Sequence, residues 1–144
     1  MNKPSARGRD AYPHFLCIPT RWMDNDVYGH VNNVVYYSYF DTVVNEYLLR
    51  TGVLDFGASD AIGLVVETQC NYFESLAFPE RVDAGLRVMK IGTSSVRYEI
   101  GLFREGDSQP AAQGHFVHVY VDRATRRPKP LSDALLAVLT PLTA

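Results

Sequence analysis

Residues 33–52 read NVVYYSYFDTVVNEYLLRTG, and this stretch decides the architecture of the chain. Asn33 is a good N-cap residue and Gly52 suits the position that follows a helix, so we predict one helix over residues 34–51. Its apolar residues form two adjacent stripes, Tyr36, Phe40, Val43 and Tyr47 beside Tyr37, Val44 and Leu48. The remaining polar strip is narrow and comprises Ser38, Asp41, Thr42 and Asn45. A helix with so little polar surface is expected to be mostly buried.

Outside this helix the hydrophobic period changes to two residues, which is typical of β-strands. An aromatic and β-branched stretch over residues 12–22 precedes the helix, and four alternating stretches follow it, over 64–72, 82–88, 96–102 and 116–121. The short joints between the later stretches favour a mainly antiparallel meander. Ser132 is a possible N-cap for a short C-terminal helix. The predicted fold class is α+β, an antiparallel sheet of about five strands wrapped around one long central helix.

Length and composition limit the class of protein. The chain has 144 residues, of which 47% are hydrophobic, and a formal net charge of −2. We expect one domain over residues 12–144 behind a flexible polar tail over residues 1–11. The longest apolar runs, 61–66 and 134–139, are far shorter than the roughly 18 to 20 residues of a membrane helix. No apolar signal region begins the chain, so a cytoplasmic location is expected.

The charge pattern and the cysteines exclude further classes. A near-neutral charge without a basic stripe argues against a nucleic-acid partner. Cys17 and Cys70 fit no disulfide framework and no metal-ligand spacing, so we predict two buried thiols and no metal site. One sheet around one helix leaves a sheet face and the edge strands uncovered, and we therefore expect self-association as a homodimer or a homotetramer.

The stretch that leads into the helix, residues 21–41, contains Asp26, Gly29, His30, Asn32-Asn33, Tyr36 and Phe40-Asp41. This pattern resembles the opening of the hotdog-fold acyl-CoA thioesterases, in particular those of the 4-hydroxybenzoyl-CoA thioesterase type. The order of predicted elements extends the resemblance over nearly the whole chain. The resemblance implies a hydrolase that cleaves an acyl-CoA thioester to a free carboxylic acid and coenzyme A.

The resemblance also implies roles for individual residues. Asp26 stands where the family has its catalytic carboxylate, which acts as a nucleophile or as a general base on water. The thioester carbonyl would lie at the helix N-terminus near Asn33, where backbone N–H groups and the helix dipole stabilise an oxyanion. His30 could polarise the carbonyl or only bond to a neighbouring strand. Gly29 could adopt a positive φ or allow close approach of the acyl chain, and Tyr36 could line the acyl pocket or belong to the core.

Several of these residues also have a purely structural interpretation. Asp24 and Asp26 could both form Asx turns, and we interpret Asp24 as the structural one. Asn33 could be only an N-cap. A second branch of the hotdog thioesterases takes its carboxylate from the central helix, and Asp41 or Glu46 could fill that role, although both lie on or near the polar strip.

Coenzyme A needs cations for its phosphates and a groove for its pantetheine arm. Basic residues between 123 and 129 form a local cluster after the last predicted strand. The hydroxyl-rich turn with Lys90, Thr93 and Ser94 resembles the place where relatives run pantetheine and nucleotide across a neighbouring subunit. No further cofactor is implied, because coenzyme A is part of the substrate.

Two other functions stay open. A hotdog hydratase or dehydratase would act on an enoyl or 3-hydroxyacyl thioester, and such enzymes resemble one another in an Asp-x-Asn-Pro-x-His stretch. Here Asp26 and His30 are four residues apart, Asp24 and His30 six, and no proline intervenes. The other candidate is a non-catalytic acyl-CoA binding module. The segment before Tyr12 is too short for the DNA-binding helix-turn-helix that acyl-CoA sensors of this fold carry.

Overall fold

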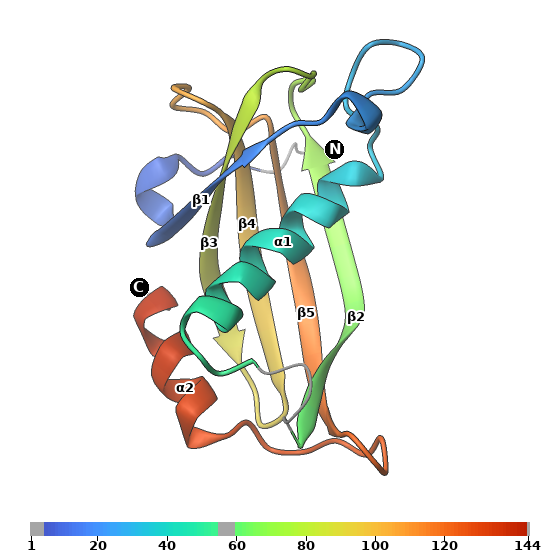
Figure 1. The fold of residues 1–144 in the computed structure, drawn as a ribbon. Coiled ribbons are helices and arrows are strands. Elements are labelled where there is room, and N and C mark those ends of the chain that lie inside the picture. Colours follow the sequence, from blue (N-terminus) through green and yellow to red (C-terminus); the bar gives the residue numbers. More distant parts are fainter. Residues whose placement is uncertain (1–4, 55–59, 144) are drawn as a thin grey trace.

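Five strands and two α-helices make up the part of the chain that is described, residues 5–54 and 60–143 of a computed structural model (Figure 1). In chain order they are β1 (His14–Pro19), α1 (Val35–Arg50), β2 (Ala61–Tyr72), β3 (Arg81–Ile91), β4 (Ser95–Arg104), β5 (Ala112–Asp122) and α2 (Asp133–Leu139). Every predicted strand and both predicted helices are present. The four later strands are longer than predicted, whereas the first is shorter.

The strands pair antiparallel in the order β1-β3-β4-β5-β2. Strands β3, β4 and β5 form the predicted meander, but β2 does not join it next to β3. It pairs instead with β5, from Ala61 opposite Asp122 to Tyr72 opposite Ala112. The connection over residues 73–80 therefore crosses the ends of β5 and β4 before β3 begins, and β2 is left as an edge strand.

Helix α1 lies across one face of the sheet (Figure 1), and its buried side chains form the centre of the core. Phe40, Val43 and Val44 are fully buried, whereas the polar strip of the helix is largely exposed, as predicted. The close packing here depends on Gly114 of β5. A Cβ at this position would lie 1.9 Å from the carbonyl oxygen of Gln69 on β2 and 2.8 Å from the Phe40 ring.

The N-terminus of α1 differs from the prediction in the residue that caps it. The helix has 16 residues and begins at Val35, one residue later than predicted. Asn32 Oδ1 accepts the N–H of Val34 at 3.0 Å, and the Asn32 carbonyl accepts the N–H of Val35 at 2.9 Å. The prediction of Asn33 as the N-cap is wrong, because Val34 occupies that position without a side-chain cap bond, while Asn32 satisfies the N–H groups of Val34 and Val35. At the other end Gly52 has the expected positive φ, +81°.

The second face of the sheet is partly covered by the N-terminal segment. Arg7 donates its backbone N–H to Gln113 at 2.7 Å and its Nε to Glu99 at 3.1 Å, and Arg9 bonds to Asp83 at 3.0 Å. The sequence predicts a flexible tail over residues 1–11, yet this part of it is bonded to the sheet. The physical reason is that Glu99 is buried on this face and needs hydrogen-bond partners.

The two cysteines are only partly as predicted. Cys70 is half-buried, but Cys17 is exposed because it lies on the edge strand β1, where alternate residues point away from the core. Within residues 5–54 and 60–143, neither α1 nor α2 has the length and hydropathy needed to span a bilayer.

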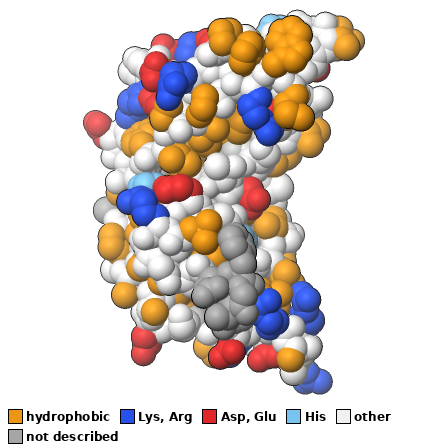
Figure 2. Space-filling view, viewed as in Figure 1, with side chains coloured by type: hydrophobic (Ala, Val, Ile, Leu, Met, Phe, Trp, Pro, Cys, Tyr) orange, Lys and Arg blue, Asp and Glu red, His pale blue; other side chains and the backbone are white. Residues whose placement is uncertain are grey.

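Large apolar side chains are exposed at one end of the molecule, in the segment between β1 and α1. Trp22, Met23, Val27, Tyr28 and Val34 each have between 66% and 94% of their surface exposed. Figure 2 shows hydrophobic side chains gathered at the upper end of the face that carries α1. Apolar exposure concentrated in this way marks a surface that contacts another molecule.

Candidate active site

The segment between β1 and α1 makes a tight turn that brings Asp26 towards the start of the helix. The N–H of Asp26 donates to the His30 carbonyl at 2.8 Å, and the N–H of Gly29 donates to the Asp26 carbonyl at 3.2 Å. Gly29 has a φ of +83°, and no atom lies within 4 Å of where its Cβ would be. The sequence left two roles for Gly29, a positive φ or close approach of the acyl chain, and the structure supports the positive φ.

Asp24 anchors this segment to the core. Its carboxylate is 1% exposed and accepts hydrogen bonds from the Tyr39 hydroxyl at 2.7 Å and from the backbone N–H of Arg21 at 2.9 Å. Burial acts to raise the pKa of Asp24, but the hydrogen bonds from Arg21 and Tyr39 outweigh it and hold the pKa below its ordinary value. Asp24 is a structural carboxylate, as predicted.

Asp26 is half-buried and borders an open cleft of about 320 Å³. The other residues that line the cleft are Val31, Asn33, Tyr36, Tyr72, Phe73, Glu74 and Ser75. Asp26 Oδ1 accepts the N–H of Tyr28 at 2.8 Å, so the Asx-type bond is present as well. A carboxylate has about four acceptor sites, and this bond leaves capacity for a water molecule or a substrate.

Two tyrosines form a wall of the cleft. The rings of Tyr36 and Tyr72 meet edge to face, with their centroids 4.8 Å apart. The Tyr72 hydroxyl donates to the Asn33 carbonyl at 2.8 Å, and the Tyr36 hydroxyl accepts the N–H of Leu76 at 3.2 Å. Burial raises the pKa of both tyrosines, so both hydroxyls stay protonated at neutral pH. Tyr36 fits both of its interpretations, because it is 2% exposed and also lines the cleft.

His30 and the two helix carboxylates lie away from this wall. His30 is exposed and is not among the described residues that line the cleft. Asp41 accepts a hydrogen bond from the side chain of Asn45 on the next turn of α1, at 2.8 Å, and Glu46 pairs with Arg50 at 3.1 Å. The structure therefore places neither helix carboxylate at the cleft.

The turn predicted to bind coenzyme A does not reach this cleft within one chain. Lys90, Thr93 and Ser94 lie where β3 ends, whereas the cleft-lining residues 73–75 come just before β3 begins. β3 has 11 residues, which at about 3.3 Å per residue span roughly 33 Å. The Thr93 carbonyl accepts the N–H of Leu131 at 3.0 Å, which brings the basic segment 123–129 to the same end of the sheet as the turn.

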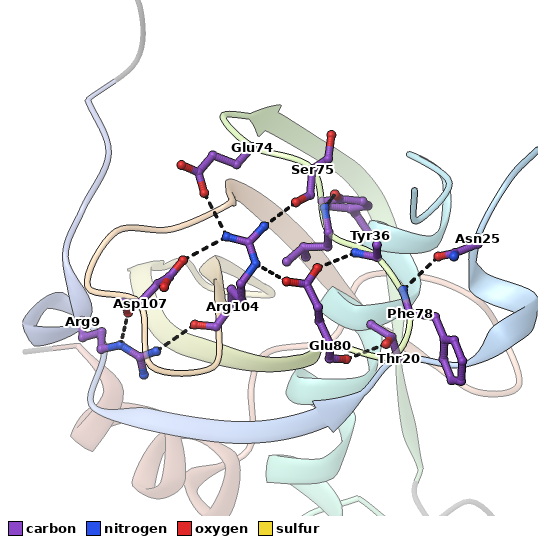
Figure 3. Close-up of polar contacts among 12 residues, drawn as sticks. Arg9, Thr20, Asn25, Tyr36, Glu74, Ser75, Phe78, Glu80, Arg104 and Asp107 are labelled. Carbon is purple, nitrogen blue, oxygen red and sulfur yellow. Dashed lines mark hydrogen bonds and ion pairs between the residues drawn. The ribbon is translucent and has the colours of Figure 1, made fainter. Parts of the chain in front are cut away.

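One wall of the cleft, formed by Phe73, Glu74 and Ser75, was not predicted from the sequence. Figure 3 shows Arg104, the last residue of β4, reaching towards this wall. Arg104 Nη1 bonds to the Glu74 carboxylate at 3.2 Å, and Nη2 donates to the Ser75 carbonyl at 2.7 Å. No spacing in the sequence connects residue 104 with residues 73–75, since they meet only because the β2–β3 connection crosses the end of β4.

Thiol and metal chemistry have little basis near the cleft. Burial raises the pKa of the Cys70 thiol to about 12, so this thiol is protonated at neutral pH and is a poor nucleophile. In the described part of the chain, one group of side chains has metal-binding geometry, namely Cys17, Asp83 and Glu105. None of these three residues lines the cleft.

Comparison with known proteins assigns the family. A profile of the thioesterase-like superfamily matches residues 20–139, a range that contains every residue lining the cleft. The chain belongs to the thioesterase-like superfamily. Its reaction class is therefore thioester hydrolysis, and its helix and antiparallel sheet match the hotdog arrangement predicted from the sequence.

Three solved structures illustrate the similarity. The PA5185 protein from Pseudomonas aeruginosa strain PAO1 is 49% identical with a TM-score of 0.94, over 97% of this chain and 98% of that one. The PA2801 protein from Pseudomonas aeruginosa is 30% identical with a TM-score of 0.80, over 88% and 97% of the two chains. A thioesterase from Thermus thermophilus, complexed with coenzyme A and Zn, is 29% identical with a TM-score of 0.76, over 93% and 97%.

Proposed function

We propose that this enzyme hydrolyses an acyl-CoA thioester and that Asp26 is the carboxylate that drives the reaction. The main support is the contrast between two neighbouring carboxylates. Asp24 is buried and accepts three hydrogen bonds from Arg21 and Tyr39, whereas Asp26 borders a cleft beside the first turn of α1. The coenzyme A bound to the Thermus thermophilus relative supports coenzyme A as the thiol component of the substrate.

Thioester hydrolysis needs a base or a nucleophile and donors for the developing oxyanion. In the general-base route, Asp26 takes a proton from a water molecule whose oxygen attacks the carbonyl carbon. The tetrahedral intermediate then collapses, the C–S bond breaks, and the coenzyme A thiolate takes up a proton. In the nucleophilic route a carboxylate oxygen of Asp26 attacks the carbonyl carbon, the C–S bond breaks and the coenzyme A thiolate leaves and takes up a proton. Water then hydrolyses the resulting anhydride, which releases the carboxylic acid and restores the Asp26 carboxylate. Both routes need Asp26 at the same place.

The N-terminal turn of α1 is the proposed oxyanion site. Backbone N–H groups at a helix start have no acceptor within the helix, and the helix dipole adds positive potential there. Asn32 accepts the N–H groups of Val34 and Val35 and so fixes how the chain enters the helix. These two donors are therefore occupied, and the contribution of the helix here is the positive potential of its dipole. Asn33 lines the cleft with an exposed side chain, and its amide can donate to the same oxygen.

A second copy of the chain would complete the coenzyme A site. β2 is an edge strand on which Leu64, Val65 and Val66 are exposed. If two such edges pair antiparallel about a twofold axis near Val66, the start of each β2 lies beside the end of the other. The sheet end that carries Ser94 would then lie beside the cleft of the second copy. The exposed apolar edge of β2 supports a homo-oligomer of this kind, which would account for the distance between turn and cleft in one chain.

The decisive experiment measures thiol release from short, medium, long and aromatic acyl-CoAs by the wild type, Asp26→Asn and Asp41→Asn. Asp26→Asn removes the charge at the cleft and is expected to lower turnover by about 100-fold or more. A positioned base or nucleophile accelerates a reaction by roughly this factor. Asp41→Asn removes the same charge on the exposed face of α1 and should stay within about twofold of wild type. An active Asp26→Asn variant would contradict the role of Asp26.

His30→Asn measures how much the histidine contributes to turnover, separately from Asp26. Because His30 is exposed and lies outside the cleft lining, we expect a smaller loss of turnover than with Asp26→Asn. A wild type that binds acyl-CoA without releasing thiol would contradict hydrolysis itself. It would favour the hydratase or the non-catalytic binding module instead.

A further inference from the structure

The β2–β3 connection, residues 73–80, joins the cleft to the turn that presents Asp26. The Leu76 carbonyl accepts the N–H of Val31 at 2.7 Å, and Asn25 Oδ1 accepts the N–H of Phe78 at 3.0 Å. Asn25 immediately precedes Asp26, and Val31 closes the same turn on its other side. The connection is therefore bonded to the Asp26 turn on both flanks, while its own residues 73–75 line the cleft.

Arg104 holds this connection from the sheet side (Figure 3). Its guanidinium bonds to the Glu74 carboxylate at 3.2 Å and to the Ser75 carbonyl at 2.7 Å, and it pairs with the Glu80 carboxylate through Nε. Asp107 accepts a further bond at 3.0 Å from Nη1, the nitrogen that also bonds to Glu74. One side chain thus bonds to both ends of the connection, at the cleft and at the start of β3.

Glu80 links Arg104 to other parts of the connection and to the end of β1. Its carboxylate also accepts the N–H of Ala77 at 2.8 Å, and its carbonyl accepts the N–H of Thr20 at the end of β1 at 3.2 Å. Without the cation of Arg104, the carboxylates of Glu74, Glu80 and Asp107 would repel one another. The connection would then lose its common point of attachment.

We infer that Arg104 is a positioning residue for the cleft, which acts by fixing the 73–80 connection and, through it, the Asp26 turn. This inference rests on the proposed function of the cleft in thioester hydrolysis. An arginine is required because its planar fork bonds to several acceptors in fixed directions, which a lysine ammonium on a flexible stem does not reproduce. Arg104 itself does not line the cleft.

The kinetic test compares Arg104→Lys and Arg104→Met with Arg81→Met. Arg81 is a matched control because it directly follows the connection, as the first residue of β3, and its guanidinium forms an exposed pair with Glu105 at 3.5 Å. We expect Arg104→Met to raise KM about tenfold and to lower kcat by about tenfold, because the misplaced wall weakens binding and the displaced Asp26 turn slows the chemical step. Arg104→Lys should fall between the wild type and Arg104→Met. An unchanged KM in both Arg104 variants would overturn the inference.

A second readout is independent of activity. Trp22 is the one tryptophan of the chain, and its ring meets that of Phe78 edge to face, with centroids 6.0 Å apart. Incorporated 5-fluorotryptophan therefore gives a single fluorine resonance that reports whether the connection is docked against the segment before Asp26. Phe78→Leu defines the position of that resonance without the neighbouring ring.

The fluorine resonance is expected to move towards the Phe78→Leu position in Arg104→Met and to stay in place in Arg81→Met. If Arg104→Met does not fold, Glu80→Gln removes one of its contacts and should move the resonance in the same direction. A resonance that stays in place in all folded variants overturns the inference. A resonance that moves in an enzyme that releases no thiol from any acyl-CoA would contradict the proposed function and leave the positioning of the connection intact.

Discussion

The hydroxyl of Tyr39 donates a hydrogen bond to the carboxylate of Asp24 at 2.7 Å and so ties the segment before α1 to the buried side of the helix. Tyr39 is 3% exposed and Asp24 is 1% exposed. Two residues later, Asp26 borders the cleft. The two residues are of the same type, but their surroundings differ. Burial and hydrogen bonding give Asp24 a structural role, whereas its position at the cleft leaves Asp26 available for chemistry.

Removing the Tyr39 hydroxyl is expected to destabilise the fold. Tyr39→Phe leaves the buried Asp24 carboxylate short of one partner, which should lower the free energy of unfolding by about 1 to 3 kcal/mol. Urea unfolding monitored by circular dichroism measures the change. Tyr28→Phe is the matched control, since Tyr28 is 81% exposed. Equal stability of Tyr39→Phe and the wild type would show that the bond does not anchor the segment.

A charge on the edge of β2 is expected to break the proposed dimer. Val66 is 59% exposed and lies at the irregularity in the pairing of β2 with β5. Val66→Lys should shift the protein towards monomer in sedimentation velocity, because a paired edge would bury the ammonium group. Leu49→Lys, on the exposed side of α1, should leave the assembly unchanged. An assembly that is unaffected by Val66→Lys would exclude the β2 edge as the contact.

The buried His118 is expected to make stability depend on pH. It is 4% exposed and lies among the rings of Tyr98, Phe116 and Tyr120. Burial lowers its pKa to about 4, whereas in the unfolded chain it is near 6.5. The unfolded state therefore binds a proton first as the pH falls. Stability should decrease between pH 6.5 and 4, by up to about 1.4 kcal/mol per pH unit, and this contribution should level off below pH 4.

His118→Phe removes this titrating group and keeps an aromatic ring in the pocket. The difference in unfolding free energy between the wild type and His118→Phe, measured from about pH 4 to 7, isolates the histidine from the carboxylates that also titrate. His30→Phe is the control for the same substitution at an exposed position. Parallel curves for the wild type and His118→Phe would contradict the prediction.

Much of the fold could be predicted because it is encoded by local periodicity. The two apolar stripes of α1 are buried as predicted, and Ser132 caps α2 by accepting the N–H of Leu135 at 3.1 Å. That Asn32, and not Asn33, accepts the N–H groups of Val34 and Val35 at the start of α1 could not be predicted. Both residues have the same chemistry, and the direction in which the chain enters the helix selects between them.

The sequence alone predicted the elements from local periodicity. Its resemblance to the hotdog thioesterases over residues 21–41 predicted the superfamily and indicated Asp26 as the candidate carboxylate. The tertiary structure decided that β2 pairs with β5, that Arg104 meets Glu74 and Ser75, and that the Ser94 turn is remote from the cleft. The physical reason is that alternation of side chains specifies a strand and its buried face but not its neighbour. The cleft is built across such long-range pairings, and its second wall therefore appears only in the folded chain.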